Sequence, residues 1–289
     1  MQARSHMMWS ITVLSLFIGV LDLAGCETNP YTGRRQLLMS SVAEEVQMGA
    51  QAYDQIKSDP KINPSQDPRE IEPVKRVAAR IIEAAKRSKY AEIAQQFQWE
   101  VTVIKDDKTA NAFALPGGKM AVYTGIFPVA KTENGLAAVM GHEVVHALAR
   151  HGAERMSQGQ VANAALQVAG AGAGAIGDGG LMSQAAMAAL GVGAQVGVLL
   201  PFSREHESEA DYVGILLAAD AGYDPRESVA LWERMAQLSN GGAPAEFLST
   251  HPSHGTRINK LKTWMPEAMA IYQTEAAVPT AALPAVGGR

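Results

Sequence analysis

The sequence has very little cysteine: its single copy is Cys26, so the 289-residue chain can form no intrachain disulfide. An excess of basic charge is also lacking, since 25 lysines and arginines stand against 29 acidic residues and the net charge is −4. Binding of nucleic acid requires a basic face, so no nucleic-acid partner is predicted. A hydrophobic content of 47% is ordinary for a packed core, and the length allows one large domain or two small ones.

Residues 1–25 have the pattern of a secretory signal peptide. A short region with Arg4 precedes an apolar run from Met8 to Val20, and the sequence then reads Leu-Ala-Gly-Cys. This ending resembles the lipobox of bacterial lipoproteins. The resemblance implies that Cys26 is lipidated, becomes the first residue of the mature chain and anchors it to a membrane. We therefore expect a lipid-anchored protein on the periplasmic side of the bacterial cell envelope.

Two residues beside this cysteine refine the expectation. Bacterial lipoproteins retained in the inner membrane often have aspartate after the cysteine, whereas this chain has Glu27, so the resemblance favours the outer membrane. Asp22 interrupts the apolar run and leaves a plain signal peptide or an anchor helix as the alternative. Residues 26–40, which include the turn-forming sequence NPYTGRRQ, are predicted to be a lipidated tether.

Residues 136–151, LAAVMGHEVVHALARH, contain His142, Glu143 and His146 in the order H-E-x-x-H. On a helix, positions i and i+4 lie on one face, so both imidazoles can reach one metal ion with Glu143 beside it. A catalytic zinc takes three protein ligands and keeps one position for water, so a third ligand must come from elsewhere. The alternative is a buried helix with two structural histidines.

A candidate for the third ligand lies in residues 203–219, SREHESEADYVGILLAA. Glu207 precedes Asp211 by four residues, so Glu207 can bind the metal while Asp211 accepts a hydrogen bond from one of the motif histidines. Glu205 has the same spacing from Glu209, and spacing therefore leaves the choice among the three glutamates open. The alternative is a solvated, acidic helix start favoured by the helix dipole.

Local patterns predict a small antiparallel β-sheet in a mainly α protein of the α+β class. Residues 98–105 alternate and are rich in valine, which favours a strand, and residues 111–115 and 120–124 flank a Pro-Gly-Gly turn. A strand edge beside the metal can bind an extended substrate as an added strand, although an ordinary hairpin fits the sequence equally well. The residues predicted for this substrate strand are Asn111, Ala112, Phe113 and Ala114.

Helices are predicted over most of the remaining body, which we place at residues 41–272. The motif helix is expected to begin after a cap at Thr132 or Asn134 and to continue to about Gln158. Residues 273–289, rich in alanine, proline and glycine, are predicted to be disordered. The other predicted helices cover residues 41–56, 68–88, 225–238 and 256–264.

Residues 160–202 are dominated by alanine and glycine. We expect two closely packed, soluble helices, because glutamine, asparagine and serine recur and large aliphatic residues are few. The length also permits a membrane span, which is the alternative and would make the protein a membrane-embedded protease.

These motifs occur together, and in this order, in a known family. The segments NAFALPGGKMAVYTGI, GHEVVHALARH, SREHESEADYVG, AGYDP and STHPSHGTRI resemble the gluzincin metallopeptidases that include the CAAX-prenyl protease and HtpX, and among these the bacterial lipoprotein branch. The resemblance implies a zincin-like fold with one Zn²⁺ per chain, held between the H-E-x-x-H helix and a second, glutamate-bearing helix. It also implies endopeptidase activity.

The resemblance assigns roles residue by residue. Glu207 takes the position of the third zinc ligand, because a Ser-Arg pair precedes it and an Ala-Asp pair follows it as in the family. Glu143 is expected to act as the general base. His251 is expected to face the developing oxyanion with support from Arg257. We also expect that His251 can occupy the fourth zinc position in a resting state.

Three further histidines are predicted to lie outside the metal site. His151 follows His146 by five residues, about 140° round an ideal helix, and is expected to face away from the metal. His206 lies about 100° from Glu207 and remains an alternative ligand. His254 is predicted to be a surface residue.

The predicted function is zinc-dependent hydrolysis of peptide bonds in misfolded or misassembled envelope proteins. The alternative is a latent protease that acts mainly as a zinc-containing chaperone or assembly factor. An intact Glu143 beside a complete ligand set favours the enzyme.

Overall fold

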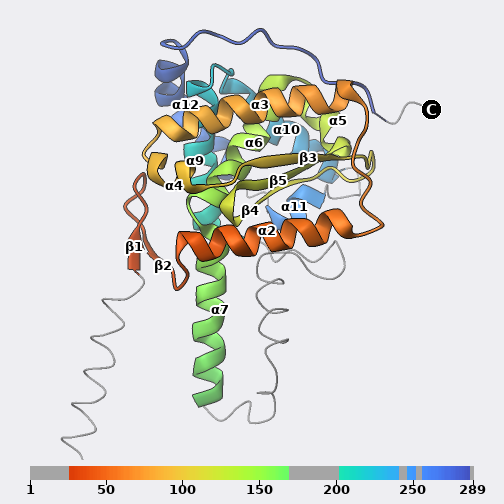
Figure 1. Cartoon of the computed structure of the whole chain (residues 1–289). Helices are drawn as coiled ribbons and strands as arrows, with labels where there is room; N and C mark the ends of the chain where they lie inside the picture. Colours follow the sequence, from red (N-terminus) through yellow and green to blue (C-terminus); the bar gives the residue numbers. More distant parts are fainter. Residues whose placement is uncertain (1–25, 169–201, 241–245, 252–255, 287–289) are drawn as a thin grey trace, which may run out of the picture.

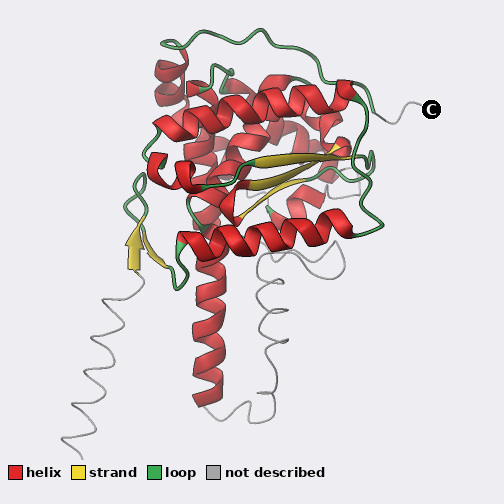
Figure 2. Cartoon of the chain, in the orientation of Figure 1, coloured by secondary structure: helices red, strands yellow, loops and turns green. Residues whose placement is uncertain are grey.

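The computed structural model describes residues 26–168, 202–240, 246–251 and 256–286 (Figure 1). Helices dominate this part of the chain, with one two-stranded and one three-stranded sheet (Figure 2). The strands are β1 (Cys26–Thr28), β2 (Arg35–Leu37), β3 (Glu100–Ile104), β4 (Ala112–Leu115) and β5 (Lys119–Tyr123). The helices are α2 (Val42–Ser58), α3 (Pro68–Arg87), α4 (Ala91–Gln96), α5 (Phe127–Ala130), α6 (Glu133–Leu148), α7 (His151–Val168), α9 (Arg204–Asp220), α10 (Arg226–Asn240), α11 (Glu246–Thr250) and α12 (Thr256–Tyr272), with 3-10 turns η1 (Pro116–Gly118) and η2 (Thr124–Ile126).

The three-stranded sheet has the order β3-β5-β4. The predicted hairpin is confirmed, since β4 pairs antiparallel with β5 and Ala112 lies opposite Val122. β3 instead pairs parallel with β5, so the sheet is mixed and not purely antiparallel. The turn between β4 and β5 places Gly117 at φ 77° and Gly118 at φ 89°, a conformation that favours glycine. The predicted mainly α fold with a small sheet is confirmed.

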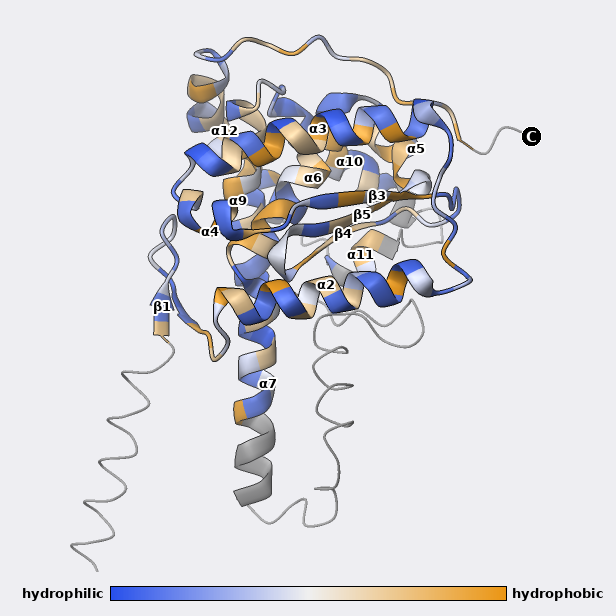
Figure 3. Ribbon diagram, in the orientation of Figure 1, coloured by the Kyte–Doolittle hydropathy of each residue, from blue (hydrophilic) through white to orange (hydrophobic). Residues whose placement is uncertain are grey.

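Helix α3 shows how local sequence builds the body. Asp67 caps it by accepting a hydrogen bond from the Arg69 backbone N–H at 2.9 Å, and Pro68 occupies its first position. Its residues Val74, Val77 and Ile81 recur at helical spacing and are fully buried. Figure 3 shows the matching pattern, with hydrophilic residues along the outer face of the helix.

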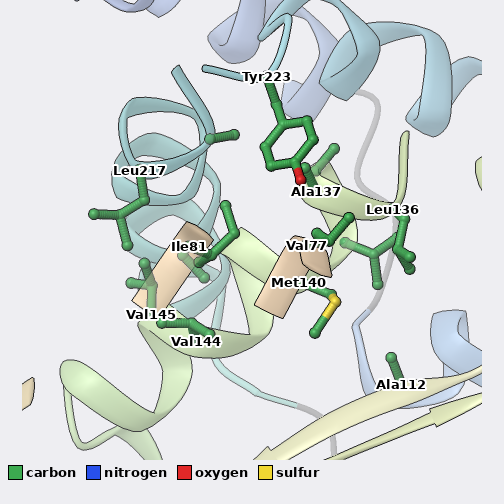
Figure 4. Close-up of a cluster of buried hydrophobic side chains, with 14 of the residues drawn as sticks. Val77, Ile81, Ala112, Leu136, Ala137, Met140, Val144, Val145, Leu217 and Tyr223 are labelled. Atoms are coloured by element: carbon green, nitrogen blue, oxygen red, sulfur yellow. The ribbon is translucent and has the colours of Figure 1, made fainter. Parts of the chain in front are cut away.

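Helix α6 runs through the centre of the molecule, and every residue from Leu136 to Leu148 is buried. Thr132 caps it and accepts a hydrogen bond from the Gly135 N–H at 3.3 Å, which confirms one of the two predicted caps. Figure 4 shows Met140 and Val145 of α6 within the cluster of buried side chains that also holds residues of α3 and α9. The motif helix is therefore anchored on several sides.

Two glycines let α6 and α9 approach closely. A Cβ added at Gly141 would lie 2.8 Å from the Gly214 carbonyl oxygen, and a Cβ added at Gly214 would lie 2.9 Å from the His142 nitrogen. Both contacts are with main-chain atoms, which a change of rotamer does not relieve. This approach brings the H-E-x-x-H residues of α6 next to Glu207 on α9.

The motif helix is shorter than predicted. It ends at Leu148, Ala149 follows as its C-cap, and Arg150 adopts a left-handed backbone with φ 56° before α7 begins. The Arg150 side chain donates to the buried carboxylate of Glu45 at 2.7 Å and to Glu27 at 2.6 Å. These ion pairs with distant residues fix the break, and α7 then extends away from the body (Figure 1).

Both ends of the described chain lie against the body. Residues 26–37, within the predicted tether, form the β1–β2 hairpin, whose Arg34 contacts buried glutamates of α7 and α9. Where composition favoured disorder after residue 272, the structure shows backbone hydrogen bonds from Glu133 N to Ala281 O at 3.0 Å and from Leu283 N to Lys131 O at 2.9 Å. These bonds pair backbone N–H and C=O groups next to the start of α6. Composition alone does not reveal that these groups need a partner.

The prediction for residues 160–202 falls mostly outside the described residues, of which this segment contributes only 160–168 and 202. Within the described part of the chain, the structure holds no helix of sufficient length and apolar character to span a membrane. The last helix, α12, continues past the predicted end at residue 264 to Tyr272 and includes Pro266.

Candidate metal centre

Four buried side chains converge on one point between α6, α9 and the residue after α11. The potential ligand atoms of all four lie within 4.8 Å of one another. The four residues are His142, His146, Glu207 and His251.

The distances among these donors fit a tetrahedral metal ion. His142 Nε2 lies 3.1 Å from His146 Nε2 and 3.2 Å from His251 Nδ1. With zinc–nitrogen bonds of about 2.0–2.1 Å, two nitrogens on one tetrahedral zinc lie about 3.3 Å apart. Imidazole nitrogens and a carboxylate are also the ligands that zinc prefers. The residues present therefore fit a zinc ion.

Glu207 completes the group from α9. Its Oε1 lies 3.5 Å from His146 Nε2, and its Oε2 lies 3.6 Å from His142 Nε2. Burial alone would raise the pKa of this carboxyl, but the adjacent His251 and the nearby Arg257 outweigh it and hold the pKa well below its usual range. The carboxylate is therefore charged and available to a cation.

Glu143 lies beside the four donors and is almost completely buried. Its Oε1 is 3.4 Å from His251 Nε2 and has no hydrogen-bond partner among the residues described. Burial is the main cause that raises the pKa of its carboxyl above the ordinary value. A carboxylate with a raised pKa, placed next to a metal site, can accept a proton from a bound water.

Asp211 orients His142 from behind. Its Oδ1 lies 3.0 Å from His142 Nδ1, so the ring donates through Nδ1 and presents Nε2 to the other ligands. Arg257 donates to the same carboxylate from Nε at 2.7 Å and from Nη2 at 2.6 Å. It also donates from Nη1 to Glu207 Oε2 at 2.5 Å.

The structure thus places Arg257 on two carboxylates, whereas the family resemblance predicted that it supports His251 at an oxyanion. The guanidinium is buried, and its carbon lies 3.5 Å from the centre of the Trp232 ring. Such a contact favours a desolvated cation. The observed contacts suit a residue that positions Glu207 and neutralises the buried acidic pair.

His151 is not among the four converging donors, as predicted, but its ring is turned toward His146 and not away from it. Its Nδ1 lies 3.0 Å from His146 Nδ1, on the side of that ring opposite the converging donors. The prediction assumed one continuous helix, but the break at Arg150 turns α7 and carries His151 back beneath His146. His151 is fully buried, and burial is the main cause that lowers its pKa to about 4.

The remaining alternative ligands, Glu205, Glu209 and His206, also lie outside the four-residue group. Glu209 accepts from His151 Nε2 at 3.0 Å, and His206 Nε2 lies 3.0 Å from Glu154. Glu209 is two positions from Glu207, so the two side chains leave α9 on different sides. Glu205 does not belong to the group either. His254 lies outside the described residues.

Aromatic rings surround the histidines. Phe247 stacks on His251 with ring centres 4.5 Å apart, and the Phe202 ring lies 4.0 Å from that of His146. These apolar neighbours lower the local dielectric and strengthen the electrostatic interactions in the site. Neither residue could be assigned to the site from the sequence, because each lies in or after a segment without a clear helical pattern.

The predicted substrate strand is β4, at the edge of the sheet. Among the described strands it pairs only with β5, so one edge of β4 has no strand partner there. Phe113 and Ala114 are half-buried, whereas Asn111 uses its side chain to accept from the Ala112 N–H at 2.9 Å. The Ala110 carbonyl accepts from the Phe247 N–H at 3.0 Å, which ties β4 to the segment that carries His251.

Comparison with known proteins gives the family. A model described as Peptidase family M48 matches residues 68–265, more than half of the chain. The chain belongs to peptidase family M48. The family assignment and the four-residue metal site confirm the predicted gluzincin fold, the zinc cofactor and the metalloendopeptidase activity.

Individual relatives support the same assignment. The chain is 37% identical over 269 residues to the mitochondrial metalloendopeptidase OMA1 of Schizosaccharomyces pombe, which covers 92% of this chain and 74% of that protein. It is 32% identical over 260 residues to OMA1 of Saccharomyces cerevisiae, covering 84% of this chain and 70% of that protein. It is 31% identical over 237 residues to the β-barrel assembly-enhancing protease of Escherichia coli O157:H7, covering 80% and 46%.

These relatives overturn the predicted location. The two yeast proteins are named as mitochondrial, which contradicts the expected outer-membrane position in a bacterial cell envelope. The bacterial lipoprotein branch of the family is likewise not supported. Cys26 is an exposed, free cysteine in β1, and its lipidation stays a prediction.

Proposed function

We propose that this M48 metalloendopeptidase hydrolyses peptide bonds in unfolded or misassembled proteins, with His142, His146 and Glu207 as the zinc ligands. The observation that carries the proposal is the convergence of these donor atoms beside the C-terminal half of α6, with Glu143 next to them. When bound, zinc lowers the pKa of a water ligand and polarises a carbonyl oxygen.

The protein groups divide the remaining work. Glu143 takes a proton from the attacking water and delivers it to the leaving amine. His251, 3.4 Å from Glu143, faces the developing oxyanion once it leaves the donor group, and Asp211 and Arg257 hold the ligands in place. An extended substrate adds to the edge of β4, which favours unfolded segments over folded domains.

A second candidate state is latent. His251 Nδ1 lies 3.2 Å from His142 Nε2 and 2.9 Å from Glu207 Oε1, as close as the proposed ligands are to one another. A fourth protein ligand fills the position that a catalytic zinc keeps for water. In that state the protein would bind zinc without cleaving, as expected for a zinc-containing chaperone or assembly factor.

One experiment tests both states. Purified protein is incubated with casein, an unfolded substrate, with and without the chelator 1,10-phenanthroline. Cleavage that the chelator abolishes and that Zn²⁺ restores supports the protease. Zinc-loaded protein without cleavage, together with suppressed aggregation of a denatured client protein, supports the latent alternative. A folded chain that takes up no zinc contradicts both.

A further inference from the structure

The two histidines of the H-E-x-x-H motif are supported in different ways. His142 Nδ1 meets a carboxylate directly, that of Asp211 at 3.0 Å. His146 Nδ1 meets another imidazole, that of His151 at 3.0 Å. A metal-binding histidine usually gives its second N–H to a carboxylate, a backbone carbonyl or a water, so the partner of His146 is unusual.

The hydrogen-bond chemistry fixes the roles in this chain of contacts. For His146 Nε2 to offer a lone pair to a metal, its Nδ1 must carry the proton and donate to His151 Nδ1. His151 must then carry its own proton on Nε2, which lies 3.0 Å from the Glu209 carboxylate. His151 therefore transmits to His146 the same preference that a carboxylate imposes when it binds a histidine directly.

Glu209 is in turn held from the N-terminal hairpin. Arg34 donates to Glu209 from Nε at 3.0 Å and from Nη2 at 2.9 Å, and the hydroxyl of Thr32 donates to the same carboxylate. A paired contact of this kind fixes both the position and the plane of a carboxylate. Arg34 also binds Glu154 of α7 at 2.6 Å, so it spans both helices beside the site.

We propose that the β1–β2 hairpin is a positioning element for the zinc site, acting through Arg34, Glu209 and His151 on the ligand His146. Arg34 fixes Glu209, Glu209 fixes the tautomer of His151, and His151 fixes the tautomer and ring orientation of His146. This inference rests on the proposed assignment of His146 as a zinc ligand. It predicts that changes in residues 26–37 alter zinc affinity although none of these residues reaches the metal.

The test measures zinc affinity of the full chain by competition with a chromophoric chelator, together with the visible spectrum of the Co²⁺-substituted protein. Loss of a partner that orients a metal-bound histidine typically costs 10- to 100-fold in metal affinity. We expect His151→Phe, Glu209→Met and Arg34→Met each to weaken zinc binding by roughly 10- to 100-fold and to change the Co²⁺ bands.

Two variants separate positioning from a merely structural role. In His151→Asn the side-chain oxygen replaces Nδ1 as the acceptor, so affinity should return to within about threefold of the unchanged protein. His206→Phe is the matched control, because His206 stacks on His151 with ring centres 4.4 Å apart and is equally buried, yet it contacts Glu154 and no ligand. It should retain zinc affinity.

The outcomes are distinct. Equal zinc affinity in His151→Phe and the unchanged protein overturns the inference, as does an equal loss in His206→Phe. If His151→Phe does not fold, Arg34→Met decides, because its side chain is 23% exposed and thermal unfolding can verify that the variant is folded. If the unchanged protein binds no zinc, the proposed function fails. If it binds zinc and no variant weakens binding, only the positioning role fails.

Discussion

At the scale of single residues, Glu143 carries the clearest prediction. The Glu143→Gln variant keeps the shape of the side chain but is unable to accept a proton. We expect the rate of casein cleavage to fall by about 10²- to 10⁴-fold, because general acid–base catalysis typically contributes a factor of this size. Zinc content, measured by atomic absorption, should be unchanged, since Glu143 is not among the four donors. Cleavage at the unchanged rate would refute the assigned role.

A second prediction at this scale concerns Arg257. The Arg257→Met variant leaves Glu207 and Asp211 as two buried carboxylates without their cation. Removing one partner of a buried ion pair typically destabilises a protein by about 3–5 kcal/mol. Urea unfolding of the zinc-free protein should show a loss of this size. Arg69→Met, in an exposed pair with Asp67, is the control and should leave the unfolding midpoint in place.

The sequence predicted the metal-binding donor residues better than it predicted the residues that contact and position them. His142 and His146 follow from spacing on one helix, and Glu207 follows from its place in the family motif. Spacing alone left Glu205 and Glu209 as competitors, because only the packing of α9 on α6 decides which carboxylate reaches the imidazoles. His151 is outside the four donors, as predicted, but its contact with His146 was not foreseen, because that contact depends on a break in the helix.

At the scale of elements, the break at Arg150 shows why local signals failed. Apart from Gly152, nothing in residues 146–158 interrupts the helical pattern, and a helix that continues to about Gln158 was predicted. The left-handed Arg150 is held by Glu45, which lies 105 residues earlier in the sequence. A contact over that separation is decided by tertiary structure, which overrides local propensity.

The contact between α6 and α9 gives the prediction at this scale. In Gly214→Ala, the added Cβ would lie 2.9 Å from the His142 nitrogen, so the helices must separate. We expect a loss of about 1–3 kcal/mol in unfolding free energy, as for other overpacked cores, and weaker zinc binding because Glu207 moves with α9. Thermal unfolding and chelator competition measure both effects.

Gly159→Ala on α7 is the matched control. A Cβ at Gly159 has no atom within 4 Å, so alanine should leave zinc affinity unchanged and stabilise the helix by a fraction of a kcal/mol. Equal effects of the two substitutions would show that the close approach of α6 and α9 does not set the geometry of the site.

At the scale of the whole molecule, a buried acidic layer joins the N-terminal hairpin to the helices and predicts acid sensitivity. Burial favours a higher pKa for Glu209, but hydrogen bonds from His151 and Arg34 outweigh it and lower the pKa to about 2 from an ordinary 4.5. Glu154 is shifted in the same direction, again against burial, by His206 and Arg34. Between pH 4.5 and 2 the unfolded chain therefore binds more protons than the folded one.

The sign of the effect follows from this difference. The stabilisation from these carboxylates is complete above about pH 4.5 and is lost as the pH falls toward 2. Melting temperatures of chelator-treated protein should drop across this window. In Arg34→Met the melting temperature should be lower at pH 7 and the further drop smaller, because the carboxyl pKa values return toward ordinary. A parallel curve for the variant would contradict the assignment.

Global packing also explains what composition failed to predict at the two ends of the described chain. Residues 26–37 and 273–286 are polar or rich in small residues, and neither has a hydrophobic pattern of its own. Each is ordered by groups that the body provides, the buried glutamates in one case and the Lys131 and Glu133 backbone in the other. A local sequence pattern shows which side chains a segment can bury, but it does not show which partner groups the rest of the fold provides.

The contact at Gly141 and Gly214 has one more consequence, for anyone who would redesign the pocket. Because main-chain atoms of α6 and α9 are in contact there, they fix the distance between the imidazole pair and the opposing carboxylate. Repacking of neighbouring side chains does not change that distance. A larger or differently coordinated cation would have to be accommodated by lengthening or shortening the ligands themselves, for example with aspartate in place of Glu207, and not by loosening the scaffold.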